Sequence, residues 1–308
     1  MKAAYPPYEL ACHLPGAYRL WRRVTASYLS PSPRPSPFQR ILLEWPIRLV
    51  TAILGAFSWI RFPKRAVGGW WWIWRYRFEM QVGWYELPTA RWIRGLLQRG
   101  SVSADIGAHI GYFTHAMSIE VGPGGHVFAF EPSPENFSLL QRNVARAGLA
   151  NAACSQLAVA DRTGAETMYV SPGHSNHSLV PGYAESGETV QVNVTTLDAF
   201  LGPVKLGPLC LVKVDAEGAE PRILKGMRQT IESTPDLVLV IEINPRALEC
   251  AGSSPDLLID AIESSDLVPR LIDPDGGARR ASRSCIRRRP EPPVYAAAYV
   301  GSTDPIAV

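Results

Sequence analysis

Two short apolar runs in this 308-residue chain each end at acidic residues and a glycine. The first run ends at Asp105 and Gly107, and the second ends at Asp215, Glu217 and Gly218. Helix-type sequence follows each of them. In a parallel α/β sheet, this arrangement places carboxylates and bare backbone at the carboxyl ends of strands, where such sheets bind ligands. The two segments are therefore the first candidates for a binding or catalytic site.

The first segment has the glycines of a ligand-binding turn without the spacing of a dinucleotide site. Three residues separate Gly107 from Gly111, with His109 in the middle, whereas the dinucleotide fingerprint reads GxGxxG. Asp105 would repel a diphosphate, but it would attract the ammonium and sulfonium charges of S-adenosylmethionine. We therefore expect Asp105, Gly107, His109, Gly111 and Tyr112 to bind this methyl donor.

Glu131 is the second candidate for donor binding. It follows the apolar run 126–130 and precedes Pro132, which stops a strand. A carboxylate at the end of the second strand, about 20 residues after a glycine turn, is placed to hold both hydroxyls of a ribose. Nicotinamide-dependent enzymes share this feature, so it is a weak signal alone. Together with the glycine turn it favours S-adenosylmethionine.

Strand and helix patterns alternate from residue 101 onward, which predicts a mostly parallel, doubly wound α/β sheet with helices on both faces. Two strand-like runs between 165 and 197 flank a loop rich in Gly, His, Ser and Asn, and they predict an inserted hairpin. A final antiparallel pair, Leu267–Asp273 and Val294–Val300, favours the seven-stranded, Rossmann-like sheet of class I methyltransferases. The other predicted strands are 101–106, 126–131, 153–160, 209–215 and 237–243, and the predicted helices are 111–121, 134–148, 219–233 and 255–265.

The chain resembles the FkbM-type S-adenosylmethionine-dependent methyltransferase family over about residues 100–245. The run Lys-Val-Asp-Ala-Glu-Gly-Ala-Glu at 213–220 is the most family-specific, and His109 stands where the family usually shows Asn. The resemblance implies O-methyl transfer to a hydroxyl, often on a sugar or a polyketide-like small molecule. It also implies that Asp161 reaches the adenine amino group. The matching stretches are 105–111, 129–136, 157–161, 194–198 and 212–220.

Few residues are candidates for the proton acceptor of such a transfer. Asp215 ends a strand beside the expected methyl position. Glu217 and Glu220 follow on the turn and the first helical positions, where a carboxylate also suits a helix N-terminus. His174 and His177 lie in the loop of the inserted hairpin, where a histidine of near-neutral pKa can act as a base or can serve the turn alone. We assign Asp215, Glu217 and His177 to catalysis and His174 to substrate binding.

Glu242 and Asn244 end the last parallel strand and should face the same pocket. With Asp215 they could form an oxygen-rich cluster suited to magnesium. Because nothing in the sequence fixes the distances, we predict that Glu242 and Asn244 bind the acceptor and that no metal is used. Lys213 is expected to pair with a neighbouring carboxylate rather than to act in catalysis.

Charge is distributed unevenly along the chain. Residues 1–100 carry 15 Lys/Arg against 4 Asp/Glu, residues 101–278 carry 10 against 22, and the last 30 carry 6 against 2, which sums to the net charge of +3. The acidic centre argues against a nucleic-acid substrate, and the basic flanks fit an anionic lipid surface or a solvated extension equally well. Five well-separated cysteines and the lack of a secretory signal favour the cytoplasm.

The sequence predicts an extension that precedes the methyltransferase domain. The apolar run 49–60 is too short to span a bilayer, which takes about 20 residues, so any membrane contact through 41–77 would be peripheral. The predicted parts are a poorly ordered Pro-rich N-terminus at 1–40, a basic and aromatic helical extension at 41–98 with helices at 38–62 and 84–98, and a methyltransferase domain at 99–308.

These observations predict an S-adenosylmethionine-dependent O-methyltransferase that acts on a hydroxyl of a sugar or another small molecule. A nicotinamide-dependent oxidoreductase is less favoured because the chain lacks the GxGxxG turn. The alternative from another class is a non-catalytic donor-binding or membrane-associated partner protein. Acids retained at the strand ends argue against that loss of catalysis.

Overall fold

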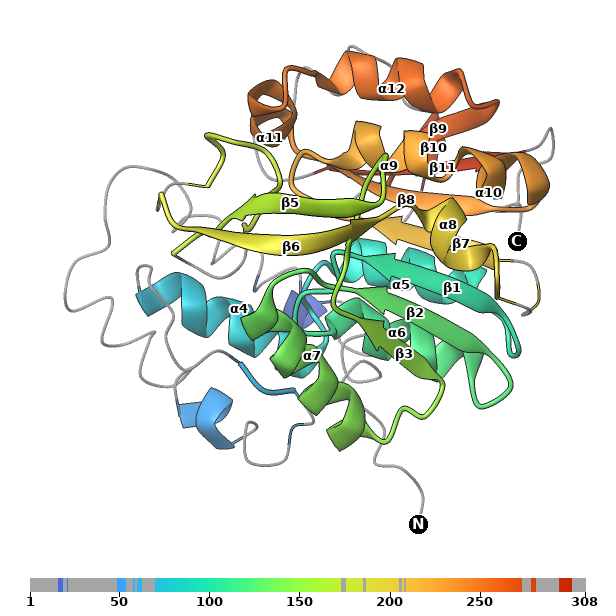
Figure 1. The fold of residues 1–308 in the computed structure, drawn as a ribbon. Helices are drawn as coiled ribbons and strands as arrows, with labels where there is room; N and C mark the ends of the chain where they lie inside the picture. The colour runs from blue at the N-terminus through green and yellow to red at the C-terminus, as the bar shows by residue number, and fades with distance from the viewer. Residues whose placement is uncertain are drawn as a thin grey trace. The chain divides into compact units, whose positions relative to one another are not determined.

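The computed structural model describes most of the chain from Trp70 onward and a few residues before it (Figure 1). The chain divides into two compact units, Met1–Leu87 and Pro88–Val308. The predicted Pro-rich N-terminus lies almost entirely outside the described residues. These are 16–18, 21, 49–53, 58, 60–62, 70–172, 176–184, 187–204, 207, 209–272, 278–280 and 294–300.

In the first unit, helix α4 (Trp70–Val82) carries an aromatic and polar cluster. The Trp21 indole Nε1 donates a hydrogen bond of 2.8 Å to the Glu79 carboxylate, and its ring lies 4.8 Å from that of Phe78. Trp84 packs against both rings at 5.8 to 6.1 Å. Trp21 thus packs its ring against other aromatic rings while its indole N–H donates a hydrogen bond, which is typical of partly buried tryptophan.

The predicted helix at 38–62 is confirmed only in part. Residues 49–53 are helical, residues 60–62 are not, and most of the remainder lies outside the described residues. The predicted helix at 84–98 corresponds to α5 (Leu87–Leu96). Among the helices of the described ranges, none has the length and apolar character needed to cross a membrane.

The second unit is built on an eight-stranded sheet of order β10-β9-β11-β8-β7-β1-β2-β3. The five strands from β8 to β3 are parallel, whereas β11, β9 and β10 pair in antiparallel fashion. The mostly parallel sheet with a terminal antiparallel pair is thus confirmed, with β10 as one strand more than predicted. The strands are β1 (Val102–Ile106), β2 (His126–Phe130), β3 (Ala152–Ser155), β7 (Leu209–Val214), β8 (Val238–Ile243), β9 (Leu267–Ile272), β10 (Ala278–Arg280) and β11 (Val294–Val300).

Helices cover both faces of this sheet. Alternate side chains of each strand point to opposite faces, so apolar residues on both faces can pack against helices. On one face Ile106 and Val214 pack with Ile223 of helix α9, and on the other Ala129 packs with Leu140 of helix α7. Strands β1 and β8 are buried at every position, as is typical of parallel strands covered on both faces. The helices of this unit are α6 (Tyr112–Val121), α7 (Pro134–Ala147), α8 (Leu197–Leu201), α9 (Glu220–Gly226), α10 (Arg228–Ser233), α11 (Pro245–Cys250) and α12 (Pro255–Glu263).

The prediction of a single helix at 219–233 is wrong. This stretch forms two helices that meet at Met227. A Cβ added at Gly226 would lie 1.9 Å from the carbonyl oxygen of Ala160, so the last turn of α9 packs directly on the backbone that leaves the sheet. The helix divides one residue after this close approach, which helical periodicity alone does not reveal.

The inserted hairpin is confirmed as strands β5 (Gly164–Tyr169) and β6 (Thr189–Thr195), which pair in antiparallel fashion. They belong to a separate three-stranded sheet of order β4-β6-β5. Its third strand, β4 (Ala158–Val159), corrects the prediction of one strand over 153–160. The chain pairs with β2 as far as Ser155 and then turns to pair with β6, so one apolar run serves two sheets.

Candidate active site

The turn after β1 lies closely against the end of β7. Gly107 has a φ of 75°, and a Cβ there would lie 1.7 Å from the carbonyl oxygen of Asp215. The backbone N–H of Asp215 donates to the carbonyl of Ile106 at 3.1 Å. The two segments singled out in the sequence are therefore neighbours at the carboxyl edge of the sheet, and only glycine fits between them.

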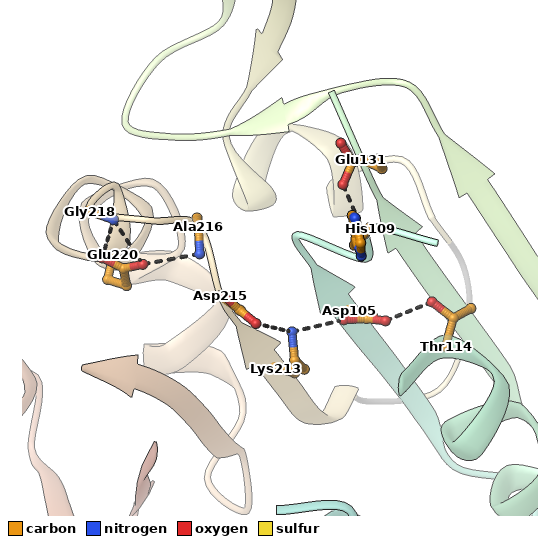
Figure 2. A network of polar contacts seen from close by, with 9 residues as sticks. All are labelled: Asp105, His109, Thr114, Glu131, Lys213, Asp215, Ala216, Gly218 and Glu220. Carbon is orange, nitrogen blue, oxygen red and sulfur yellow. Dashed lines mark hydrogen bonds and ion pairs between the residues drawn. The ribbon is translucent and has the colours of Figure 1, made fainter. Parts of the chain in front are cut away.

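Glu131 and His109 shape the other side of this turn (Figure 2). The backbone N–H of His109, a residue with a φ of 51°, donates to Glu131 Oε2 at 2.8 Å, and that of Ser133 donates to Oε1 at 2.9 Å. The Asn136 side chain also hydrogen-bonds to this carboxylate. Burial raises the pKa of Glu131 to about 7. A carboxylate fixed by two N–H groups fits the predicted contact with a ribose.

Gly111 begins the helix that follows the turn. With a φ of 93° it is the N-cap of α6, and a Cβ there would lie 2.8 Å from the Leu140 side chain. Tyr112, the first residue of α6, is buried and its ring packs edge to face on that of Phe113 at 5.3 Å. The close packing of this corner supports Gly111 as part of a cradle, whereas a donor contact by Tyr112 stays a prediction.

Lys213 joins the two segments through a buried ion pair (Figure 2). Its Nζ lies 3.1 Å from Asp215 Oδ2 and 3.6 Å from Asp105 Oδ1, and it lies 5.0 Å from the centre of the Phe113 ring. The hydroxyl of Thr114 donates to Asp105 Oδ2 at 2.6 Å. The ion pair expected for Lys213 is confirmed. Because Asp105 is completely buried, it holds the turn from behind, and direct attraction of the donor's charges stays a prediction.

Three carboxylates converge where β7 and β8 end. One oxygen from each of Asp215, Glu217 and Glu242 lies within 4.8 Å of the other two. The Glu242 side chain is almost entirely buried, whereas that of Asp215 is 23% exposed. Burial and the charge of Asp215 raise the pKa of Glu217 to about 8, and burial followed by the same charge raises that of Glu242 well above its usual range. This cluster can accept protons or bind a cation.

Glu217 is held by side chains from two other segments. The Tyr183 hydroxyl donates to Glu217 Oε2 at 2.7 Å, and the Asn244 amide donates to the same oxygen at 3.0 Å and to the Tyr183 hydroxyl at 2.9 Å. The Ser178 hydroxyl donates to the carbonyl of Glu217 at 2.6 Å. The structure thus brings Glu217 and Asn244 together, and it places Tyr183 beside them.

Glu220 has a structural role. Its carboxylate is fully buried and accepts hydrogen bonds of 3.0 Å from the backbone N–H groups of Ala216 and Gly218 (Figure 2). Burial raises its pKa to about 7. These bonds close the turn that presents Asp215 and Glu217.

The remaining predicted residues make contacts of their own outside the carboxylate cluster or lie beyond the described part of the chain. His177 Nδ1 accepts from the backbone N–H of Ser171 at 2.9 Å, which leaves the proton of a neutral ring on Nε2. Asp161 forms an ion pair of 2.7 Å with Arg222, so an adenine contact stays a prediction. His174 lies outside the described residues.

Two residues of the site were missed in the sequence. Thr114 holds Asp105 from the first turn of α6, and a hydroxyl nine residues after a strand-end acid is a weak signal by itself. Tyr183 lies in the connection between β5 and β6, and nothing in the local sequence marks it as a site residue. Neither contact can be identified without the tertiary structure, because both link elements whose relative placement the sequence leaves open.

Two relatives share part of this chain. "Methyltransferase 1" of Beauveria bassiana is 35% identical over 147 residues, which cover 41% of this chain and 58% of that protein. The "31-O-demethyl-FK506 methyltransferase FkbM" of Streptomyces tacrolimicus is 29% identical over 160 residues, which cover 42% of this chain and 61% of that protein. The chain therefore spans about three fifths of the length of these relatives.

Solved structures give a looser likeness. An O-methyltransferase from Bacillus cereus in complex with SAH has a TM-score of 0.43 and 13% identity, covering 92% of this chain and 99% of that one. A precorrin-6y C5,15-methyltransferase from Geobacter metallireducens GS-15 has a TM-score of 0.41 and 15% identity, covering 70% of this chain and 88% of that one. At these scores the fold assignment depends on the strand order described above.

The family is decided by a domain model. The model described as "Methyltransferase FkbM domain" matches residues 105–265, which is just over half of the 308 residues. The match begins at the acid of the glycine turn and contains the strand-end carboxylates described above. The chain therefore belongs to the FkbM family of S-adenosylmethionine-dependent methyltransferases.

Proposed function

We propose that this protein transfers a methyl group from S-adenosylmethionine to a hydroxyl of a sugar or another small molecule. The observation that carries the proposal is the meeting of the glycine turn and Glu131 with the carboxylates of Asp215, Glu217 and Glu242 at one edge of the sheet. The relative named for 31-O-demethyl-FK506 supports an oxygen atom of a small molecule as the acceptor.

The donor half of the site fits the methyl donor. The Glu131 carboxylate is our candidate acceptor for the ribose hydroxyls, and Gly107 lets the backbone of the turn approach a ligand closely. Asp161 is our candidate for the adenine. The chemistry that the bound donor supplies is an activated methyl group on a sulfonium sulfur.

The acceptor half provides for the proton of the hydroxyl. The Asp215 side chain is 23% exposed, unlike the buried Glu242, and we assign it to accept this proton as the oxygen–methyl bond forms and the methyl–sulfur bond breaks with its electron pair on sulfur. Glu217, Glu242 and Asn244 orient the acceptor. In the tautomer described above, Nε2 of His177 carries the proton and is a hydrogen-bond donor. We therefore propose that His177 donates a hydrogen bond and that Asp215 is the base.

The first experiment is a calorimetric titration of the full chain with S-adenosylmethionine. We expect saturable binding that Glu131→Ala weakens at least about tenfold, since it removes a hydrogen-bonded carboxylate. Glu249→Ala, at an exposed position of α11, is the control and should bind as the wild type does. A well-folded wild type that binds no donor would contradict the proposal and favour a non-catalytic partner protein.

The second experiment tests the acceptor and the base. The chain is incubated with labelled donor and a panel of sugars and polyketide-type alcohols, and methyl transfer is followed by mass spectrometry. We expect Asp215→Asn to keep donor binding and to lower methyl transfer about 100-fold, the usual size of a general-base effect. Unchanged transfer by this variant would remove Asp215 from the mechanism.

Peripheral membrane contact is a separate proposal for the N-terminal segment 41–77. In the described part of this segment Leu49, Val50 and Ile53 are exposed, and residues 1–100 carry the excess of basic residues noted above. Apolar side chains beside basic ones are typical of helices that lie at a bilayer surface. Flotation with anionic vesicles tests it: binding lost in Leu49→Ser, Ile53→Ser supports the proposal, and no flotation contradicts it.

A further inference from the structure

The carboxylate cluster at the ends of β7 and β8 gathers three acidic side chains in a small volume. Asp215, Glu217 and Glu242 each place one oxygen within 4.8 Å of the others. The cation that lies among them in the described residues is Lys213, and it also compensates Asp105. Like charges this close repel strongly in a partly dry site unless a proton or a cation comes between them.

Glu242 gives an independent indication of what the cluster lacks. Its side chain is 4% exposed, and its Oε2 accepts no hydrogen bond from any residue that the structure describes. A buried acceptor without a partner costs about 1 to 3 kcal/mol, and more when it is charged. Since Glu242 belongs to the buried strand β8, it cannot turn out to water.

The neighbouring contacts leave the cluster shaped for a cation. Both donors to Glu217, the Tyr183 hydroxyl and the Asn244 amide, reach its Oε2, and Lys213 reaches Oδ2 of Asp215. These bonds orient two carboxylates while using one oxygen of each. A fixed set of carboxylate oxygens at a partly open edge is the kind of site that hard divalent cations occupy, with water in the remaining positions.

The separation of the oxygens agrees with this class of ion. Two oxygens on opposite sides of one hard cation lie roughly 4.2 to 5 Å apart, given bond lengths of about 2.1 to 2.5 Å. The clustered oxygens already lie within 4.8 Å of one another. A single proton shared between Asp215 and Glu242 is the alternative, and the titration described below distinguishes it from a bound cation.

We infer that Asp215, Glu217 and Glu242 form a binding site for one hard divalent cation of the magnesium or manganese type. This goes against the expectation from the sequence that no metal is used. Taken with the proposed function, on which this step rests, the cation would bind the acceptor hydroxyl and lower its pKa. Cation binding itself requires neither donor nor acceptor.

The test is a titration of the full, metal-stripped chain with Mn²⁺, followed by electron paramagnetic resonance of the free ion. We expect one Mn²⁺ per chain, competition by Mg²⁺, and at least a tenfold loss of affinity in Glu242→Gln. Glu249→Gln, the same substitution at an exposed position of α11, should bind Mn²⁺ as the wild type does. Circular dichroism of the same samples shows whether Glu242→Gln keeps its fold, and calorimetry with S-adenosylmethionine measures donor binding separately.

Each outcome decides one claim. A wild type that binds S-adenosylmethionine but no Mn²⁺ at millimolar concentration overturns the cation site and favours the shared proton, with the proposed function intact. Mn²⁺ binding that Glu242→Gln leaves unchanged places the ion elsewhere and also overturns the inference. Mn²⁺ binding lost in Glu242→Gln, in a wild type that binds no donor, supports the cation site and contradicts the proposed function alone.

Discussion

The two halves of the site satisfy their carboxylates in different ways. In the donor half, Asp105 is bound by Thr114 and Lys213, and Glu131 by two backbone N–H groups of nearby residues. In the acceptor half, carboxylates face one another, and Glu242 keeps an oxygen without a hydrogen bond among the described residues. Protein groups therefore satisfy the carboxylates of the donor half, whereas those of the acceptor half are satisfied only in part. We therefore expect the donor half to change little when the donor binds, and the carboxylates of the acceptor half to interact directly with the acceptor or with an ion.

The largest effect should come from breaking the contact between the halves at Gly107. In Gly107→Ala the new Cβ meets the carbonyl oxygen of Asp215 at 1.7 Å, in a backbone conformation that side chains rarely adopt. The turn must move, so we expect donor binding to be undetectable and the free energy of unfolding to fall by more than about 4 kcal/mol. Calorimetry and denaturant unfolding measure the two quantities.

Gly148→Ala is the matched control for this substitution. Gly148 ends α7 with a φ of 68°, close to that of Gly107, but nothing lies within 4 Å of its added Cβ. Backbone strain alone costs about 1 kcal/mol, so this variant should bind the donor normally. Equal losses in the two variants would show that the close approach to β7 has no special importance.

Removal of Lys213 should destabilise both halves. Lys213→Met leaves the buried carboxylate of Asp105 and the neighbouring Asp215 without their cation, and loss of one partner from a buried ion pair costs about 3 to 5 kcal/mol. Chemical denaturation measures this loss. The double variant Lys213→Met, Asp105→Asn should recover part of it, because the uncompensated charge is gone. A Lys213→Met protein as stable as the wild type would show that the ion pair contributes nothing.

Donor binding should depend on pH through Glu131. Burial raises its pKa to about 7, so the empty site holds a protonated carboxyl below that pH. The ribose hydroxyls need the ionised form, and binding must then release a proton. We therefore expect the Kd for S-adenosylmethionine to be about tenfold weaker at pH 6 than at pH 8. Glu131→Gln should bind weakly and without this pH dependence, and a flat profile in the wild type would argue against the ribose contact.

The sequence predicts the strand-end acids and glycines well, because each follows a buried strand within one local motif. Asp105, Glu131 and Asp215 can be assigned to the carboxyl edge of the sheet from the sequence alone. The partner of Lys213 can be named only as a neighbouring carboxylate, since Asp105 is 108 residues away and becomes close only when β1 pairs with β7. Register between distant strands is a tertiary property.

Two errors have the same origin. The apolar run at 153–160 reads as one strand, yet the chain passes from one sheet to another between Ser155 and Ala158. The helix at 219–233 reads as continuous, yet it divides where Gly226 packs on the backbone of Ala160. Both changes of direction are decided by the inserted sheet and by close packing. Local propensity and periodicity therefore cannot predict either change of direction.

The smallest effect should separate the halves most cleanly. Tyr183→Phe removes the hydroxyl that donates to Glu217 at 2.7 Å, while Asn244 still donates to the same oxygen. Loss of one hydrogen bond of two costs about 0.5 to 1.5 kcal/mol, or roughly 2- to 10-fold. We expect the KM for the first acceptor identified by the panel to rise by this factor, while the Kd for S-adenosylmethionine stays unchanged. Tyr169→Phe on β5 is the control, and an equal effect of Tyr183→Phe on donor binding would show that the halves are not independent.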